Sequence, residues 1–298
     1  MNKNPTLLSR RAMLEGMGLA ALAPLVAARS HAQDAPPPPA APAAAAAADG
    51  AAPAVSQLPL KTTGLEHMGT IVPDVEAAGK FYGRLFNPEI YKEKDPPLRY
   101  YVTLGVGYLA LGTHGSAPKG YFDHFCALVE NYDPKAMAEE LKAQGLPPGK
   151  FGIIPDPEGC GFQLLGVPGG LAKTVVPAGR IVPEEALVKP VHLDHVVVRT
   201  TDLEKSLMFY RRFLGEEENN KHHSEQAWFQ IAQTRLGLER APTGEMGHID
   251  RIGIKVQSFD HKMVGRELKT MGAIVTHESR KGLLFTDPVG LTMELQPV

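Results

Sequence analysis

The stretch His67-Met68-Gly69-Thr70-Ile71-Val72-Pro73-Asp74 has a counterpart in His195-Val196-Val197-Val198-Arg199-Thr200-Thr201-Asp202, and the two align without a gap. The agreement continues beyond Asp74 and Asp202, where it pairs Glu76 with Glu204, Phe81 with Phe209, Tyr82 with Tyr210 and Arg84 with Arg212. Self-similarity at a fixed spacing is the mark of a repeated supersecondary unit. The chain therefore contains a duplication.

A second pair of segments repeats in the same way. His124-Phe125-Cys126 aligns with Arg251-Ile252-Gly253, and each segment leads to an Asp-Pro-x-Gly turn. These turns begin at Asp156 and Asp287, and they precede Gln163 and Glu294. The duplication thus gives two halves, residues 58–170 and 190–298, joined by a Pro-, Gly- and Val-rich connector at 171–189.

Each half contains two units with one plan. After Asp74 and Asp202, apolar residues recur at helical spacing, and an aspartate in that place caps a helix N-terminus. Residues 100–111 and 228–238 have the alternation of strand hairpins. The sequence predicts an α+β fold of four βαβββ units.

Composition excludes several classes of protein. The chain of 298 residues carries 31 Lys and Arg against 33 Asp and Glu, a formal charge of −2, so no basic excess exists to bind nucleic acid. It has no run of 18 apolar residues, and we expect no membrane span. Its two cysteines, Cys126 and Cys160, are too few for a disulfide scaffold or a zinc ribbon.

The first residues have the layout of an export signal. Residues 1–32 combine Arg10-Arg11, a short apolar stretch and the small-residue exit Ser30-His31-Ala32, which is typical of a signal peptide. The paired arginines resemble a twin-arginine signal, the alternative being a Sec signal with two chance arginines. Residues 33–57, rich in Pro and Ala, are expected to be a tether. We therefore expect a periplasmic or secreted protein.

The repeated plan, with a first-strand His and an Asp-Pro-x-Gly turn before a last-strand Gln or Glu, resembles the vicinal oxygen chelate superfamily. That superfamily includes glyoxalases, extradiol dioxygenases, fosfomycin-resistance thiol transferases and bleomycin-resistance binding proteins. The resemblance covers nearly all of residues 58–298. It implies two glyoxalase/dioxygenase-like half-barrel domains, each able to hold a divalent metal on residues of its first and last strands. Because the resemblance makes these strands neighbours, a disulfide between Cys126 and Cys160 and two buried thiols are equal alternatives.

In the first half, the resemblance implies that His67, His124 and Gln163 are metal ligands, with Gly112 at a fourth place. Imidazole nitrogens and an amide oxygen suit Fe, Mn, Ni or Zn. Gln163 stands where a Glu is usual, so this set carries one negative charge less. We expect one divalent metal in this half.

In the second half, the corresponding residues are His195, Glu239 and Glu294, with Arg251 in the place of His124. A fixed guanidinium opposes a metal and favours pairing with a carboxylate. We therefore expect a metal-poor second half, with Arg251 either in a structural ion pair or binding an anionic substrate.

The function implied is a metal-dependent, dioxygenase-like enzyme for a small substrate with two adjacent oxygens, with Tyr101 and Phe125 among the aromatics expected to line its pocket. Glyoxalase-like isomerase or lyase chemistry comes second, because the usual carboxylate base is absent. A metal-free, small-ligand binding protein of the bleomycin-resistance type is the alternative from another class. The sequence assigns no catalytic residue, and it is compatible with a monomer or a homodimer.

Overall fold

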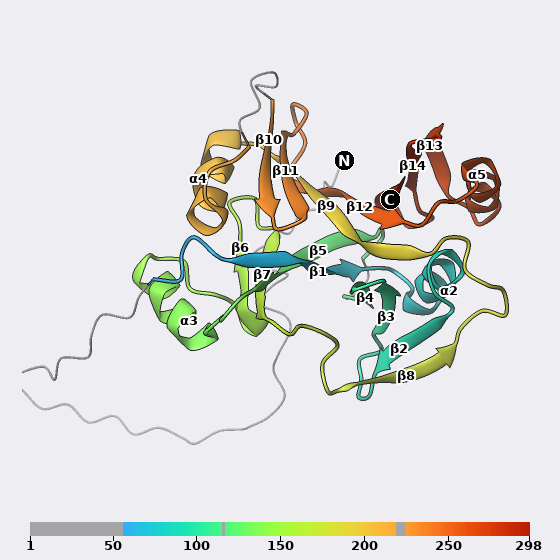
Figure 1. Ribbon diagram of the computed structural model, residues 1–298, viewed down its shortest axis with the longest axis horizontal. Coiled ribbons are helices and arrows are strands. Elements are labelled where there is room, and N and C mark those ends of the chain that lie inside the picture. The colour runs from blue at the N-terminus through green and yellow to red at the C-terminus, as the bar shows by residue number, and fades with distance from the viewer. Residues whose placement is uncertain (1–55, 115–116, 219–224) are drawn as a thin grey trace, which may run out of the picture. The chain divides into compact units, whose positions relative to one another are not determined.

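The computed structural model describes residues 56–114, 117–218 and 225–298 (Figure 1). The predicted signal peptide and nearly all of the predicted tether lie outside the described residues. Within the described part of the chain, no helix is long and apolar enough to cross a membrane.

The first half consists of two units that each begin with a long strand. The first unit contains β1 (Thr62–Ile71), α2 (Val75–Leu85), β2 (Glu89–Glu93), β3 (Tyr100–Leu104) and β4 (Gly107–Gly112). The second contains β5 (Tyr121–Val129), α3 (Pro134–Ala143), a 3₁₀ turn (Lys150–Gly152), β6 (Ile153–Pro155) and β7 (Gly161–Gly166). The connector also forms a strand, β8 (Val175–Arg180), which pairs with β2 and so extends the sheet of the first half.

The second half repeats this plan. Its first unit contains β9 (Pro190–Thr200), α4 (Leu203–Leu214), β10 (Gln226–Ile231) and β11 (Thr234–Arg240). Its second unit contains β12 (His248–Val256), α5 (His261–Thr270), β13 (Ile274–Ser279), β14 (Gly282–Thr286) and β15 (Thr292–Pro297). The predicted fold class is confirmed. Only the first and last of the four units show the full βαβββ plan in the described residues, since the two middle units show two strands after the helix.

Each helix begins after an aspartate, as the sequence predicted for two of them. The carboxylates of Asp74, Asp133, Asp202 and Asp260 accept hydrogen bonds from backbone N–H groups of the first turn. These bonds satisfy donors that a helix leaves unpaired at its start. The caps fix where each chain segment turns from strand to helix.

Strand pairing follows one pattern in both halves. The first strands of the two units pair antiparallel, β1 with β5 and β9 with β12, and each pairs in parallel with the last strand of its own unit. The register is the same as well: His67 lies opposite Cys126, and His195 lies opposite Gly253, the residue that aligns with Cys126. The two halves are joined along the sheet through Ile249 and Phe122.

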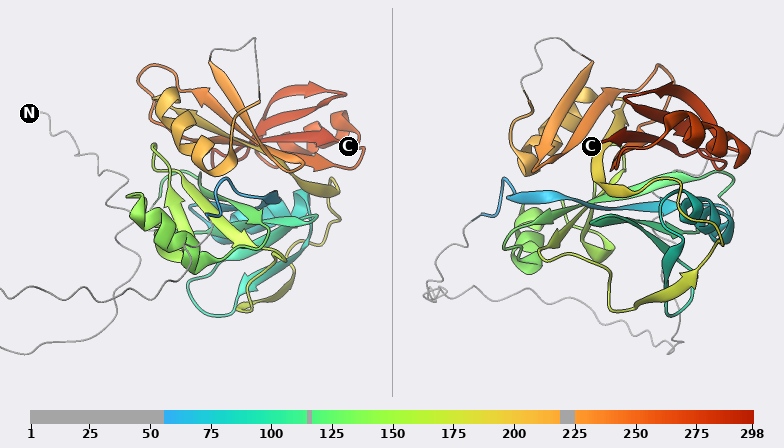
Figure 2. Two further views of the ribbon diagram at one scale, coloured as in Figure 1. Left: turned by 60° about the vertical axis from the view of Figure 1, so that its left-hand side comes forward. Right: turned by 45° about the vertical axis from the view of Figure 1, so that its right-hand side comes forward.

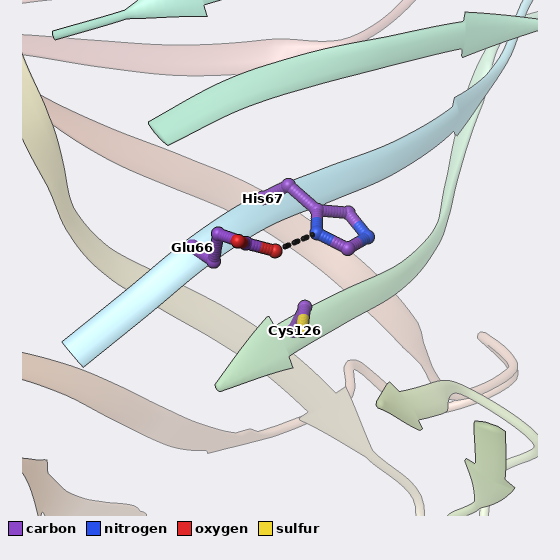
Figure 3. Close-up of side chains that lie close together, drawn as sticks. All are labelled: Glu66, His67 and Cys126. Carbon is purple, nitrogen blue, oxygen red and sulfur yellow. Dashed lines mark hydrogen bonds and ion pairs between the residues drawn. The ribbon is translucent and has the colours of Figure 1, made fainter. Parts of the chain in front are cut away.

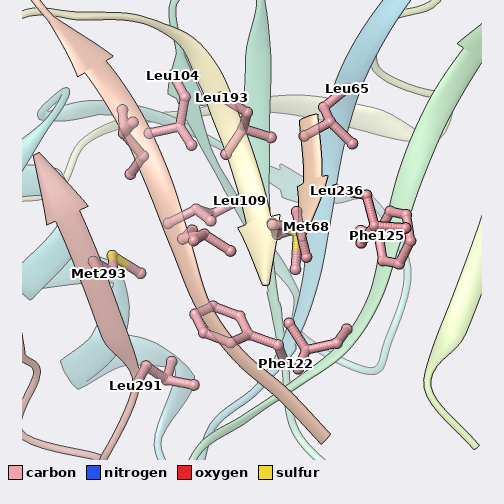
Figure 4. Packing of buried hydrophobic residues seen from close by; sticks show 14 of the residues in the cluster. Leu65, Met68, Leu104, Leu109, Phe122, Phe125, Leu193, Leu236, Leu291 and Met293 are labelled. Carbon is pink, nitrogen blue, oxygen red and sulfur yellow. The ribbon is translucent and has the colours of Figure 1, made fainter. Parts of the chain in front are cut away.

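The two halves also share a core, with the second half stacked on the first (Figure 2). The hydroxyl of Tyr82 on α2 donates to Asp287 in the second half (2.5 Å), and that of Tyr210 on α4 donates to Asp156 in the first (2.8 Å). The ring of Phe162 lies 6.0 Å from that of Tyr210. Leucine, methionine and phenylalanine side chains from both halves fill the space between the strands (Figure 4).

Replacing Tyr210 by Phe should lower the free energy of unfolding by about 1–3 kcal/mol, because the buried Asp156 carboxyl loses a donor. Tyr91→Phe is the matched control, since the Tyr91 side chain is partly exposed and should change stability by less than about 0.5 kcal/mol. Denaturant titration measures both. Equal effects of the two variants would contradict the assignment.

Burial raises the pKa of Asp156 to about 6, against the hydrogen bonds from Tyr210 and the turn backbone, which lower it. The unfolded chain loses this proton at a lower pH, so the free energy of unfolding should fall as pH rises from about 4 to about 6. The contribution of Asp156 should be roughly 3 kcal/mol at most. Asp156→Asn should remove it, which unfolding curves across this pH range would show as a smaller slope than that of the unmodified protein.

Candidate metal centre

The three predicted ligands of the first half come together on one face of its sheet. His67 on β1, Cys126 on β5 and Gln163 on β7 lie in one row across three paired strands, and His124 lies one pleat farther along β5. Alternation along a strand places His124 and Cys126 on the same face. The Nε2 atoms of His67 and His124 are 3.2 Å apart.

Two glycines make room for the His124 ring. A Cβ atom on Gly69 would lie 2.0 Å from the Cε1 atom of His124, and one on Gly161 would lie 2.5 Å from its Cβ. These residues are the direct neighbours of His124 on β1 and β7. Any larger residue at either place would drive the ring away from His67.

Each histidine is oriented by the acidic residue before it. The Nδ1 atom of His67 pairs with Glu66 and that of His124 with Asp123, both at 2.8 Å; Figure 3 shows the first of these pairs. The Glu66 carboxylate also accepts the backbone N–H of Gly170 at 2.6 Å. With the ring proton held on Nδ1, each Nε2 presents a lone pair. At 3.2 Å the two Nε2 atoms form a hydrogen bond when one of them carries a proton, and without that proton their lone pairs repel unless a metal ion lies between them. The same distance is the spacing of two nitrogens that bind one metal ion at about 2.1 Å.

Gln163 has the donor end of its amide occupied and the acceptor end open. Its Nε2 donates to the backbone carbonyl of Phe151 at 2.8 Å. Its Oε1 is buried and has no hydrogen-bond partner among the residues that the structure describes. An unpartnered buried amide oxygen is costly, and a metal ion would satisfy it. The residues present therefore fit a divalent metal.

The surroundings keep His67 in the form that binds a metal. Burial lowers its pKa, and neighbouring His124 lowers it further, while Glu66 and Gln163 act in the opposite direction. Neutral imidazole is the metal-binding form. Glu66, His67 and Cys126 also place three ligating groups within 4.8 Å of one another, but the Nδ1 of His67 is already bonded to Glu66 there (Figure 3).

Of the two aromatics predicted to line the pocket, only Tyr101 lies near the centre. Tyr108 stacks on His67 with ring centroids 4.7 Å apart, and Tyr101 packs against Tyr108 while its hydroxyl donates to Glu93. Phe125 lies on the opposite face of β5, fully buried against Phe162 in the core. It does not reach the histidines.

The sequence predicts Gly112 at the fourth place of the metal centre, but the strand pairing puts Ala110 there. On β4 the residue paired with Gly69, two after His67, is Ala110, just as Gln163 on β7 is paired with Cys126, two after His124. Ala110 therefore corresponds to Gln163, and its methyl group offers no ligand atom. Cys126 and Cys160 are both buried, and no disulfide joins them.

In the second half, the cation Arg251 takes the place of a metal ligand. Its guanidinium pairs with Glu239 at 2.5 and 3.0 Å and with Asp250 at 2.8 Å, which is the structural ion pair rather than a free anion clamp. Burial acts to lower the pKa of His195, but Asp194 and Glu294 raise it above the usual value. A raised pKa favours the protonated imidazole, which does not bind a metal, and Glu294 lies 3.5 Å from the Nε2 atom of His195.

The second half also lacks the space that a histidine at the position equivalent to His124 would need. Arg251 is flanked by Val197 and Thr292, whereas His124 is flanked by Gly69 and Gly161. A histidine at 251 in the position of His124 would meet both side chains. The difference between the halves is therefore one of room as well as of ligand type.

Comparison with family models finds a similarity in the second half of the chain. Residues 192–295 match the Glyoxalase/Bleomycin resistance protein/Dioxygenase superfamily. The matched residues lie within the second half. Comparison with curated proteins found no match.

Solved structures resemble the chain over most of both halves. The Mn(II)-bound glyoxalase from Novosphingobium aromaticivorans superposes with a TM-score of 0.57 at 13% identity, over 80% of this chain and 83% of its own. A catechol 2,3-dioxygenase gives 0.57 at 19% identity, over 80% and 89%. The 2,3-dioxygenase LapB from Pseudomonas sp. KL28 gives 0.57 at 17% identity, over 80% and 93%. At these identities the likeness shows the fold, and it confirms the predicted fold across both halves.

Arg251→His alone should add no metal to the second half, because Val197 and Thr292 crowd the new ring. Arg251→His with Val197→Gly and Thr292→Gly should add about one ion per chain through His195, the new histidine and Glu294. Metal analysis after dialysis, in a His67→Ala/His124→Ala background with folding checked by circular dichroism, measures this. A single variant that gains an ion as readily as the triple one would refute the role of the glycines.

Proposed function

We propose that the first half holds one divalent metal through His67, His124 and Gln163, and that the protein is an enzyme for a small substrate with two adjacent oxygens. The approach of the two Nε2 atoms to 3.2 Å, with both Nδ1 atoms paired to carboxylates, carries this proposal. The unpartnered Oε1 of Gln163 supports it as a third ligand. The superfamily match and the dioxygenase and glyoxalase folds are consistent with it.

When bound, such an ion supplies Lewis acidity to two neighbouring substrate oxygens. Two neutral imidazoles and an amide oxygen suit Fe, Mn, Ni or Zn. The chain itself orients the ligands through Glu66 and Asp123, and Tyr108 forms a wall beside His67. Ala110 supplies no ligand atom at the fourth place.

A dioxygenase-like reaction fits these residues better than isomerase or lyase chemistry. Isomerisation next to a carbonyl needs a general base that reaches the substrate. In the described part of the centre, the neighbouring carboxylates of Glu66 and Asp123 are engaged by the histidine Nδ1 atoms. Gln163 and Ala110 occupy the remaining places, and neither can take a proton.

The second candidate, metal-free binding, is favoured by one observation and only for the second half. Arg251 and its two carboxylate partners occupy the place of a metal there. We therefore assign the metal to the first half and a metal-free role to the second. We further propose export to the periplasm or outside the cell, on the basis of residues 1–32.

The mature protein, purified without a His-tag or chelator, should contain about one divalent ion per chain. His67→Ala/His124→Ala should lose it, and His195→Ala should keep it, because His195 lies in the other half. Elemental analysis of the three proteins gives the answer. An unmodified protein that binds no added Fe, Mn, Ni or Zn would rule the metal enzyme out, and ligand screening for a binding protein would follow.

A further inference from the structure

The short turn before β6 holds its backbone in an unusual conformation. Phe151 has φ 57° and ψ 21°, in the left-handed region that residues other than glycine seldom adopt. Its aromatic side chain is 79% exposed, so packing of the side chain does not offset the cost of this conformation. The Gly149 N–H donates to the carbonyl of Ile153 at 2.7 Å and closes the turn. The turn directs the backbone carbonyl of Phe151 toward the buried side chain of Gln163.

That carbonyl meets the side chain of Gln163. A carbonyl oxygen only accepts hydrogen bonds, so the end of the amide that faces it is the NH₂ group, 2.8 Å away. The other end, Oε1, is thereby directed to the face that carries His67 and His124. The chemistry of the pair, rather than packing, sets which amide atom faces the histidines.

We propose that Phe151 is a positioning residue whose backbone carbonyl makes position 163 specific for an amide ligand. This inference rests on the proposed metal centre. A glutamate has the same length, and as an anionic ligand it ordinarily binds a divalent metal more strongly. Here one of its oxygens would face the Phe151 carbonyl, acceptor against acceptor, in a buried place.

The consequence is a reversed order of metal affinity. Gln163→Glu should bind Mn²⁺ about tenfold or more weakly than the unmodified protein, as expected when the group that orients a ligand is lost. Phe151→Gly keeps the carbonyl and tolerates the left-handed backbone, so its affinity should stay within about twofold. Phe151→Pro cannot adopt φ 57°, and it should weaken binding about tenfold.

The decisive experiment is a calorimetric titration of these variants with Mn²⁺ alone, extended to Gln163→Glu/Phe151→Pro. If the carbonyl acts through residue 163, the double variant should lose much less than the product of the two single losses. Equal or tighter binding by Gln163→Glu, or full additivity of the two losses, would overturn the inference while leaving the metal centre standing.

A metal-free measurement separates this inference from the proposed function. Without metal, the carboxyl group that Gln163→Glu introduces can donate to the Phe151 carbonyl when it is protonated and cannot when it is ionised. Gln163→Glu should therefore be destabilised relative to the unmodified protein at pH 8, by about tenfold in the unfolding equilibrium, and should recover towards pH 4. This result together with no Mn²⁺ binding by the unmodified protein would refute the metal centre only. Equal stability of the two proteins at pH 8 would refute the amide specificity.

Discussion

The antiparallel pairing of β1 with β5 is the constraint on which the first-half centre depends. Its register places Gly69 beside His124 and Cys126 beside His67, and the parallel neighbour β7 adds Gly161 on the other side of His124. A shift of one residue would turn every one of these side chains to the opposite face. Because the two flanking residues lack side chains, the His124 ring can reach the Nε2 of His67. The carboxylates of the preceding residues then fix which nitrogen is available.

In the second half the same strand register carries different residues, and they form a partly buried cluster of ion pairs around Arg251. There the flanking positions hold Val197 and Thr292, and the intervening side chain is Arg251. The guanidinium is already paired with two carboxylates, and Arg251 in turn lowers the pKa of Glu239. The same backbone arrangement thus supports a site suited to a metal ion in the first half and a site filled by the Arg251 guanidinium in the second.

Much of this could be predicted from the sequence because duplication compares the chain with itself. The internal repeats predict two halves, and the resemblance to the vicinal oxygen chelate superfamily implies the three residues that lie together in the first half. The sequence does not predict that Glu66 and Asp123 bind the histidine rings, because adjacent residues of a regular strand point to opposite faces. Their side chains nevertheless reach the ring of the next residue, next to bulges in the β1–β5 ladder.

Other features of the structure cannot be predicted from the residue types. The position of Ala110 rather than Gly112 opposite Gly69 depends on the register of the parallel pairing between β1 and β4, which is a long-range contact. The Phe151 carbonyl could not be predicted at all, because every residue has a carbonyl and only the backbone angles direct it. The strand β8 was expected to be a plain connector, and its pairing with β2 is a long-range contact.

The exchange of tyrosine and aspartate between the halves bears on how such a chain can change over generations. Each half supplies a tyrosine hydroxyl that donates a hydrogen bond to a buried carboxyl of the other half. Tyr82 donates to Asp287, and Tyr210 donates to Asp156. A chain cut between the halves would leave both carboxyls without that partner and expose the rings that now fill the shared core. The second half can therefore be altered by substitution but not removed, because its side chains complete the core of the first half.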